Sequence, residues 1–321
     1  MKVNQIRPEH LKVLARAAYE KDLEFYLSNK NSFEQRQCPA CSLHSSGTYL
    51  QKEGFEFSKC MGCGCIYMNP GPTPELVNEL YRNSSNYKFW SEFMYPQSKD
   101  ERLSTIHKER AIWVLSFLKK RFPNRSRFEI LELGAGTGDS LVTILRQDPT
   151  NLKGFAVEPN ESMQKHLLEN GIEVIQLADL ESQEFQDRFD AVVSFEVLEH
   201  LLKPGEFFSI FKANLKKEGF LFATTPNANS FEVLLLQDKS ITIDIEHISI
   251  LTPAALQALA ISNGYRVEHV STPGEFDIEL INETLEEFSI MMHKDSTTAD
   301  SQALIRETGT SSHMRCILSL Q

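Results

Sequence analysis

Long hydrophobic runs are missing from this 321-residue sequence, although 41% of its residues are hydrophobic. No apolar stretch approaches the ~20 residues that a membrane-spanning helix needs. The first eight residues also lack the apolar run of a secretory signal. With 24% charged residues and a mean hydropathy of -0.30, the composition is typical of a soluble globular protein. We therefore expect a cytoplasmic protein without integral membrane contact.

Positive charge is also scarce. Lys and Arg number 33 against 44 Asp and Glu, which gives a net charge of -11 and a pI of about 5.4. Because nucleic-acid binding depends on Lys and Arg that neutralise phosphates, this balance argues against general binding of DNA or RNA. We expect no nucleic-acid partner, and no pattern predicts an oligomeric state.

Cysteine is nearly absent outside one segment, which contains five of the six residues. A disulfide framework would be spread more evenly, and no thioredoxin-like pattern surrounds the cysteines. The segment instead contains two C-x2-C pairs separated by 18 residues, the spacing of a zinc ribbon. Four thiolates complete a tetrahedral site, so the predicted zinc is structural. The predicted ligands are Cys38, Cys41, Cys60 and Cys63, with Cys65 as an alternative ligand and Cys316 as a buried strand residue.

Short apolar segments alternate with helical segments from Arg127 onward. Such alternation implies right-handed β-α-β units and a mostly parallel sheet covered on both faces, so the predicted fold class is α/β. The strands are expected at 128–133, 154–158, 173–177, 191–195, 220–224, 266–270 and 314–318, with helices at 161–169, 205–217 and 253–263.

The first 124 residues follow a different pattern. Pro8 suits the first turn of an amphipathic helix, and Thr73 and Pro74 are a good N-cap and first helical residue. Helices are therefore predicted over about 8–27, 74–82 and 101–121. The predicted units are an N-terminal helix (1–36), a zinc ribbon (37–72), a helical linker or lid (73–124) and an α/β domain (125–321) with an insertion at about 228–252 and a flap at about 282–311.

A glycine-rich loop follows the first strand of the predicted α/β domain. Gly134, Gly136 and Gly138 allow a tight turn and let a ligand approach the backbone, while the next helix offers free N–H groups. Glu132 precedes this loop and suits a ligand that carries a positive group rather than a pyrophosphate. A Gly-x-Gly-x-Gly loop alone fits nucleotide sites of several kinds.

Two further acidic residues stand after neighbouring strands. Glu158 ends the second strand, where a carboxylate can accept hydrogen bonds from both ribose hydroxyls. Asp179 follows the third strand and is placed to contact an adenine amine.

This combination resembles the class I S-adenosylmethionine (SAM) methyltransferases over about residues 125–270. SAM has an adenosine, a sulfonium and an amino-acid tail but no phosphate, so acidic residues suit it better than basic ones. The resemblance implies a Rossmann-like seven-stranded sheet and SAM as cofactor. The alternatives are a dehydrogenase-like dinucleotide fold and a degenerate fold that binds nothing. The implied cofactor residues are Glu132, Gly134, Ala135, Gly136, Gly138, Glu158 and Asp179.

The segment after the fourth strand is similar to the one that lines the methionine end of SAM in that family. The resemblance places Phe195 and Glu196 near the cofactor. His200 is either a base that faces the acceptor or a structural residue hydrogen-bonded at a helix start.

Methyl transfer from a sulfonium is an in-line displacement that needs alignment rather than an acid. A hydroxyl acceptor also needs a base, and a histidine with a pKa near 6.5 suits that role. His247 is the leading candidate because acceptors bind at the carboxyl end of such sheets; its alternative is a loop histidine bonded to backbone. His313 is a weaker candidate. The aromatic residues Tyr87, Phe89, Trp90 and Tyr95 either stack on a ligand or pack the linker onto the domain.

The whole chain is similar to bacterial methyltransferases that carry an N-terminal zinc ribbon, often encoded among genes for surface polysaccharides and modified sugars. This resemblance implies methylation of a small sugar or nucleotide-sugar acceptor. The alternatives are an RNA or protein methyltransferase that docks through the ribbon, and a SAM-binding protein without turnover. The resemblance is carried by Cys38-Pro39-Ala40-Cys41, 52–55, 68–73, 246–249, 272–277 and 311–314.

Overall fold

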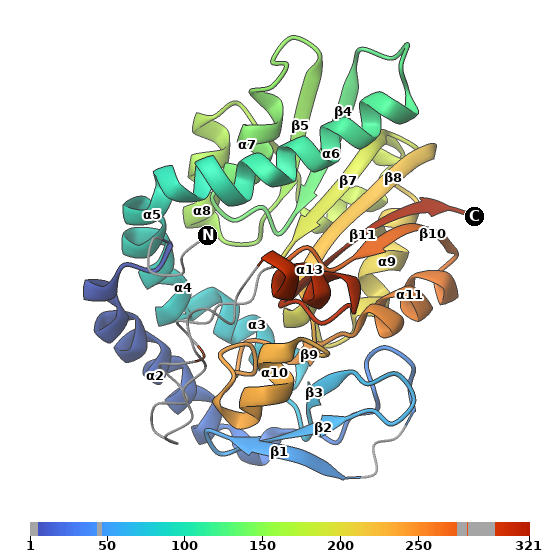
Figure 1. The fold of residues 1–321 in the computed structure, drawn as a ribbon. Helices are drawn as coiled ribbons and strands as arrows, with labels where there is room; N and C mark the ends of the chain where they lie inside the picture. Colours follow the sequence, from blue (N-terminus) through green and yellow to red (C-terminus); the bar gives the residue numbers. More distant parts are fainter. Residues whose placement is uncertain (1–5, 44–46, 275–280, 282–298) are drawn as a thin grey trace.

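Two β-sheets organise the chain in the computed structural model, which describes residues 6–43, 47–274, 281 and 299–321 (Figure 1). The larger sheet has seven strands in the order β10-β11-β8-β7-β4-β5-β6, and the smaller has four in the order β1-β2-β3-β9. No described helix has the length and apolar character that crossing a membrane requires.

The seven-stranded sheet is parallel except for one strand. β4 pairs in parallel with β5 and β7, β7 with β8, and β5 with β6, whereas β11 runs antiparallel to both of its neighbours. The predicted α/β class and mostly parallel sheet are therefore confirmed. The strands are β4 (Phe128–Leu133), β5 (Leu152–Val157), β6 (Glu173–Val174), β7 (Phe189–Phe195), β8 (Leu215–Pro226), β10 (Tyr265–Ser271) and β11 (His313–Leu320).

Helices cover both faces of this sheet and create two cores. Val192 packs into one core with α9 (Pro204–Lys212) and α11 (Pro253–Ser262), whereas its neighbour Val193 packs into the other. Because successive strand residues point to opposite faces, every residue of β7 is buried. The second core contains residues of α6 (Lys108–Arg121), α7 (Asp139–Leu145) and α8 (Glu161–Glu169).

The four-stranded sheet joins two distant parts of the chain. β1 (Thr48–Lys52), β2 (Phe55–Lys59) and β3 (Ile66–Met68) form antiparallel pairs, and β9 (Ser249–Ile250) adds a fourth strand through Ile66–Ile250 pairing. One core beneath it combines residues from both parts, among them Phe57, Met68 and Ile248. The cysteine-containing segment thus shares its core with the segment after β8, which also contains α10 (Phe231–Leu236) and η8 (Gln237–Lys239). Figure 1 shows this sheet at one end of the molecule.

A long helical stretch leads from this sheet to the large one. Thr73 caps α3 (Pro74–Asn83) by accepting a hydrogen bond from the Leu76 amide, as its sequence predicts. From Ser85 to Arg121 the backbone stays helical, so the helix predicted from residue 101 begins earlier. Two π-helical segments interrupt it, and such segments are frequent at functional sites. The elements are η1 (Glu9–Leu11), α2 (Lys12–Ser28), η2 (Lys30–Ser32), α4 (Ser85–Phe89), η3 (Trp90–Met94), α5 (Tyr95–Arg102) and η4 (Leu103–His107).

Three sequence predictions were wrong in detail. The third strand ends at Val174 because the chain turns into 3-10 helices, η5 (Leu177–Glu181) and η6 (Gln183–Phe185). The helix expected over 205–217 ends at Lys212, since Leu215 already pairs with Phe189 in the sheet. Part of the expected flap is helix α13 (Ala299–Glu307), closed by Gly309 at a φ of 74°. Residues 282–298 of that flap lie outside the described residues.

Candidate active site

A cavity of about 2500 Å³ opens at the carboxyl ends of β4, β5, β7 and β8. Its wall is completed by the N-terminal helices, by the segment between η8 and β9, and by the start of β11. This is the edge at which open α/β sheets bind ligands.

The glycine loop forms one wall of the cavity. All three glycines have a positive φ, between 55° and 78°. A Cβ on Gly134 would lie 2.6 Å from a Val197 methyl carbon, and one on Gly138 would lie 2.3 Å from a Leu167 methyl carbon. A Cβ on Gly136 would meet only the Met163 sulfur, at 3.9 Å, so a ligand can approach this backbone closely. Gly134, Ala135 and Gly136 line the cavity, whereas Gly138 stands behind it as the residue before α7.

Glu158 is fixed by the loop it faces. One carboxylate oxygen accepts a hydrogen bond from the Gly136 amide (2.7 Å) and the other from the Asn160 amide (2.9 Å). Burial raises the pKa of this carboxyl, and the two N–H groups oppose that rise. A carboxylate has about four lone-pair positions, so Glu158 can still accept hydrogen bonds from a ligand in the cavity.

Glu132 lies deeper in the same wall. The side chain is 2% exposed and accepts a hydrogen bond from the Leu141 amide (3.1 Å). Burial raises the pKa of Glu132 to about 8, although the charge of Arg110 acts in the opposite direction. A positive group of a ligand at this point would stabilise the ionised carboxylate.

Asp179 is not among the residues that line the cavity. It lies in η5, and the residues that line the cavity after the third strand are Gln176 and Leu177. Leu177 is 50% exposed, which leaves an apolar face toward a ligand. Sequence reasoning overlooked both residues because it expected the strand to continue to 177. The side-chain amide of Gln176, next to the end of the strand, was the signal that could have identified them.

Glu196 begins the turn after β7 and has a φ of 57°, a conformation that few non-glycine residues adopt and that is frequent at functional sites. One of its oxygens accepts hydrogen bonds from Arg110 (3.0 Å) and Thr224 (2.5 Å), and the other lies 3.2 Å from His313 Nε2. Burial alone would raise the pKa of Glu196, but the charges of His313 and Arg110 hold it well below its usual range. Arg110 also covers the Phe195 ring at 4.7 Å.

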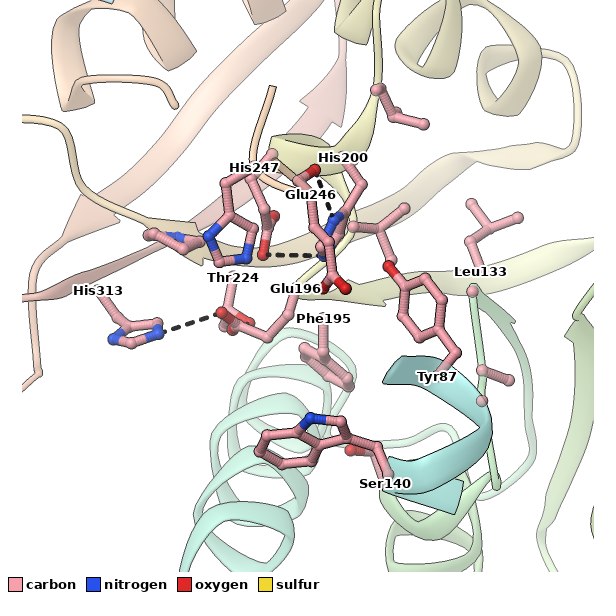
Figure 2. Close-up of a pocket in the computed structure, with 18 of the residues that line it drawn as sticks. Tyr87, Leu133, Ser140, Phe195, Glu196, His200, Thr224, Glu246, His247 and His313 are labelled. Carbon is pink, nitrogen blue, oxygen red and sulfur yellow. Dashed lines mark hydrogen bonds and ion pairs between the residues drawn. The ribbon is translucent and has the colours of Figure 1, made fainter. Parts of the chain in front are cut away.

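Two histidines meet in the cavity wall near Glu196, where the rings of His200 and His247 lie 4.9 Å apart (Figure 2). His200 Nδ1 is 3.0 Å from the Glu246 carbonyl oxygen, and His247 Nδ1 is 2.8 Å from the Thr242 carbonyl oxygen. A carbonyl only accepts, so each Nδ1 carries a proton, and the neutral form of each ring has its lone pair on Nε2. Burial and the charge of His247 lower the pKa of His200 to about 3. Both histidines therefore bond to backbone and line the cavity at once.

The aromatic residues divide between the two roles considered for them. Tyr87, Trp90 and Tyr95 line the cavity, and Tyr87 stands at the edge of His200. Phe89 is buried in a small core with Met94.

Two arginines flank one of these aromatic rings. The guanidinium of Arg7 lies 5.5 Å and that of Arg102 5.6 Å from the centre of Trp90, and both line the cavity. Burial lowers the pKa of both. Within the described part of the chain, neither has a carboxylate within ion-pair distance, whereas Arg110 pairs with Glu196. Sequence reasoning missed this pair because isolated arginines in an acidic chain form no motif.

The four predicted zinc ligands converge beside the connection between β2 and β3. Their sulfur atoms all lie within 4.8 Å of one another, and the Cys38–Cys63 and Cys41–Cys60 pairs are both 3.4 Å apart. This geometry fits one tetrahedral zinc after a small contraction, because thiolates ~2.3 Å from an ion lie within 4 Å of each other. Cys65 is fully buried and is not part of the cluster.

Comparison with known proteins places this geometry in context. Residues 104–270 match the model of a family described as a methyltransferase domain. No curated protein matches the chain. Similar solved structures include a complex between the Haloferax volcanii Trm112 methyltransferase activator and a putative methyltransferase (16% identity, 73% of this chain and 97% of that one, TM-score 0.47). The plantazolicin methyltransferase BpumL in complex with SAH is also similar (13% identity, 77% of this chain and 98% of that one, TM-score 0.46). So is a SAM-dependent methyltransferase from Archaeoglobus fulgidus (19% identity, 65% of this chain and 93% of that one, TM-score 0.43).

Proposed function

The chain belongs to the methyltransferase-domain family and is a SAM-dependent methyltransferase, and from this premise we propose that it methylates a small, sugar-like acceptor that carries an anionic group. The observation that carries the acceptor class is the Arg7–Trp90–Arg102 cluster on the cavity wall. A nucleotide sugar combines both features, a polyhydroxyl ring and a phosphate. His200 and His247 line the same cavity, and their Nδ1 atoms bond to backbone carbonyls, so Nε2 of either ring can accept a proton from a hydroxyl acceptor.

The cofactor site is proposed at the glycine loop. The open backbone at Gly136 and the fixed carboxylate of Glu158 fit a ribose, and the buried Glu132 fits an ammonium group. Gln176 and Leu177 replace Asp179 as the residues proposed for the adenine, with Phe195 and Glu196 toward the methionine end. When bound there, SAM supplies a methyl group activated by its sulfonium.

The acceptor's anionic group is proposed to bind between Arg7 and Arg102. Both guanidinium groups are half-buried, and neither forms an ion pair with a carboxylate among the described residues, so an added anion would stabilise them. Guanidinium groups also match phosphate oxygens geometrically. This local positive wall is the exception in a chain whose net charge is -11.

The proposed chemistry uses one histidine. His247 Nε2 accepts the hydroxyl proton of the acceptor. His200 Nε2 is the weaker candidate, because burial lowers the pKa of His200 to about 3. The acceptor oxygen then bonds to the methyl carbon as the carbon–sulfur bond breaks and its electron pair stays on sulfur. Holding the acceptor between the arginines aligns it for this displacement.

A structural zinc is the remaining part of the proposal. Four converging thiols in a segment that shares its core with the α/β domain fit a closed site that stabilises the fold rather than performing chemistry. Under this proposal, the boundaries at residues 37, 73 and 125 separate segments of the sequence, but these segments share cores and fold as one unit.

Calorimetric titration of zinc-assayed protein with SAM and with SAH tests the cofactor site. Incubation with methyl-labelled SAM then tests nucleotide sugars, the matching free sugars, RNA and peptides as acceptors. We expect label on nucleotide sugars, and Arg102→Gln should raise the KM for them by ~10- to 100-fold with SAH affinity unchanged. Arg121→Gln, an exposed residue outside the cavity, is the matched control. Failure of both SAM and SAH to bind would overturn the proposal. Methyl label found only on RNA or peptide would overturn it as well.

A further inference from the structure

Glu199, His200 and His247 form a second cluster of metal-ligating groups, separate from the cysteines. One ligand atom of each lies within 4.8 Å of the others, and all three residues line the cavity. Ligands ~2.1 Å from a common ion are roughly 3 to 3.5 Å apart, so shifts of about an ångström would bring these atoms into a coordination sphere.

Both imidazoles are already held in the orientation that a metal ligand needs. Each directs its Nδ1–H at a backbone carbonyl, which leaves Nε2 as the only nitrogen with a lone pair. Metal-bound histidines almost always donate their second N–H in this way, because the bond fixes the tautomer and the ring orientation. Asp244 adds a carboxylate 3.3 Å from His247 Nδ1, and is itself fixed by two backbone N–H groups.

Glu199 provides the observation that points to a cation. Its side chain is 1% exposed, and one oxygen accepts a hydrogen bond from Thr225 Oγ1 (2.9 Å). The other oxygen lies 3.9 Å from His200 Nε2. No Lys or Arg in the described part of the chain forms an ion pair with it, and Glu196 adds a second negative charge nearby. An ionised carboxylate that is buried without a positive partner is costly, so Glu199 holds either a proton or a cation in that proton's place.

We propose that Glu199, His200 and His247 bind a divalent cation on the acceptor side of the cavity. Two imidazoles and one carboxylate are the ligand set that suits Mn²⁺, Fe²⁺ and related ions. Three protein ligands leave coordination positions open toward the cavity, where water or an acceptor oxygen binds. The cysteine cluster differs in kind, since four thiolates favour zinc and close its coordination sphere.

The role of this cation rests on the proposed function, whereas its binding does not. The Nε2 lone pair of His247 binds either a proton or a cation. When the cation is bound, His247 is no longer the base, and the cation activates the acceptor hydroxyl instead. The cation would orient the acceptor oxygen and lower the pKa of its hydroxyl.

The test uses the full-length protein loaded with one equivalent of zinc, titrated with Mn²⁺ and followed by the electron paramagnetic resonance signal of free Mn²⁺. Mn²⁺ prefers nitrogen and oxygen ligands to thiolates and leaves the zinc in place. We expect one Mn²⁺ per chain, with at least ten-fold weaker binding in His247→Gln and Glu199→Gln. His107→Gln is the matched control, because His107 lines the same cavity but bonds Ser140.

The variants differ in their risk to folding. Glu199 is fully buried, but the His247 side chain is 20% exposed, so His247→Gln keeps the test decisive if Glu199→Gln fails to fold. Mn²⁺ binding that His247→Gln abolishes supports the site, even where no tested acceptor is methylated. Absence of Mn²⁺ binding, or equal binding by wild type and His247→Gln, overturns it, even where SAH binds and methyl transfer is found.

Discussion

Thr252 Oγ1 donates a hydrogen bond to the backbone carbonyl of Cys63 (2.7 Å) and accepts one from the Ala255 amide (3.0 Å). One fully buried hydroxyl thus caps α11 and ties the second cysteine pair to the α/β domain. Arg36 makes a second connection, because its guanidinium donates to the carbonyls of Ile248 (3.1 Å) and Leu202 (2.7 Å). The cysteine segment is therefore an integral part of the molecule.

Replacing Thr252 by Ala should lower the free energy of unfolding by ~1 to 2 kcal/mol, because both the cap and the link to Cys63 are lost. Urea denaturation of zinc-loaded protein measures the effect. Thr73→Ala is the matched control, since Thr73 caps α3 through a 3.4 Å hydrogen bond from the Leu76 amide. An equal loss in the two variants would contradict a linking role for Thr252.

Zinc content should follow the four clustered cysteines. We expect about one zinc per chain in wild type and in Cys65→Ala, and almost none in Cys60→Ala, because only the second variant removes a converging sulfur. Atomic absorption measures the content. Chelation should lower the Tm of the whole chain, since β9 pairs with β3 of the same sheet. Equal zinc loss in Cys65→Ala, or an unchanged Tm after chelation, would contradict the predicted ligand set or its structural role.

SAH affinity should depend on the ionised form of Glu158. Glu158→Gln replaces one acceptor oxygen by an NH₂ group, which meets the amide of either Gly136 or Asn160 donor to donor. We expect SAH binding to weaken by ~10- to 100-fold in calorimetric titration. Glu161→Gln changes an exposed carboxylate on the same cavity wall and should have little effect. Unchanged affinity in Glu158→Gln would remove this residue from the cofactor site.

Local patterns predicted much of the fold. The strand over 128–133 and the helix over 161–169 were placed correctly, because apolar periodicity and flanking glycines are local signals. The cysteine pairs were recognised for the same reason, since ligand spacing within a knuckle is fixed by geometry. The candidate loop from Gly134 to Gly138 follows directly from the end of the first strand.

Contacts between distant residues were not predicted. Ile66 and Ile250 pair across 184 positions, and a two-residue strand has no periodicity to reveal it. The meeting of Arg7 with Trp90 and Arg102 depends on how the bend before η1 packs against the long helical stretch. Helix α13 was not predicted, because its polar sequence has weak apolar periodicity. Such features arise from tertiary packing, which a local pattern does not encode.

Glu132 should make stability fall as the pH rises. Its pKa is near 4.5 in the unfolded chain and about 8 in the fold, where burial disfavours the charged form. Between these values the native state keeps a proton that the unfolded chain releases, so the free energy of unfolding decreases as pH increases. Glu132→Gln has no such proton, and its carbonyl can still accept the Leu141 amide.

Urea denaturation of wild type and Glu132→Gln at pH 5.5, 7 and 8.5 measures this contribution. We expect wild type to lose on the order of a few kcal/mol relative to the variant across this range. Glu129→Gln, on the same strand but half-buried at the surface, should keep the wild-type dependence of stability on pH.

The proposed binding of an ammonium group beside Glu132 adds a second expectation, because stabilising the ionised carboxylate releases its proton. SAH binding at pH 7 should then show a heat that varies with the ionisation enthalpy of the buffer in wild type and much less in Glu132→Gln. Parallel stability profiles would show that Glu132 is already ionised at neutral pH.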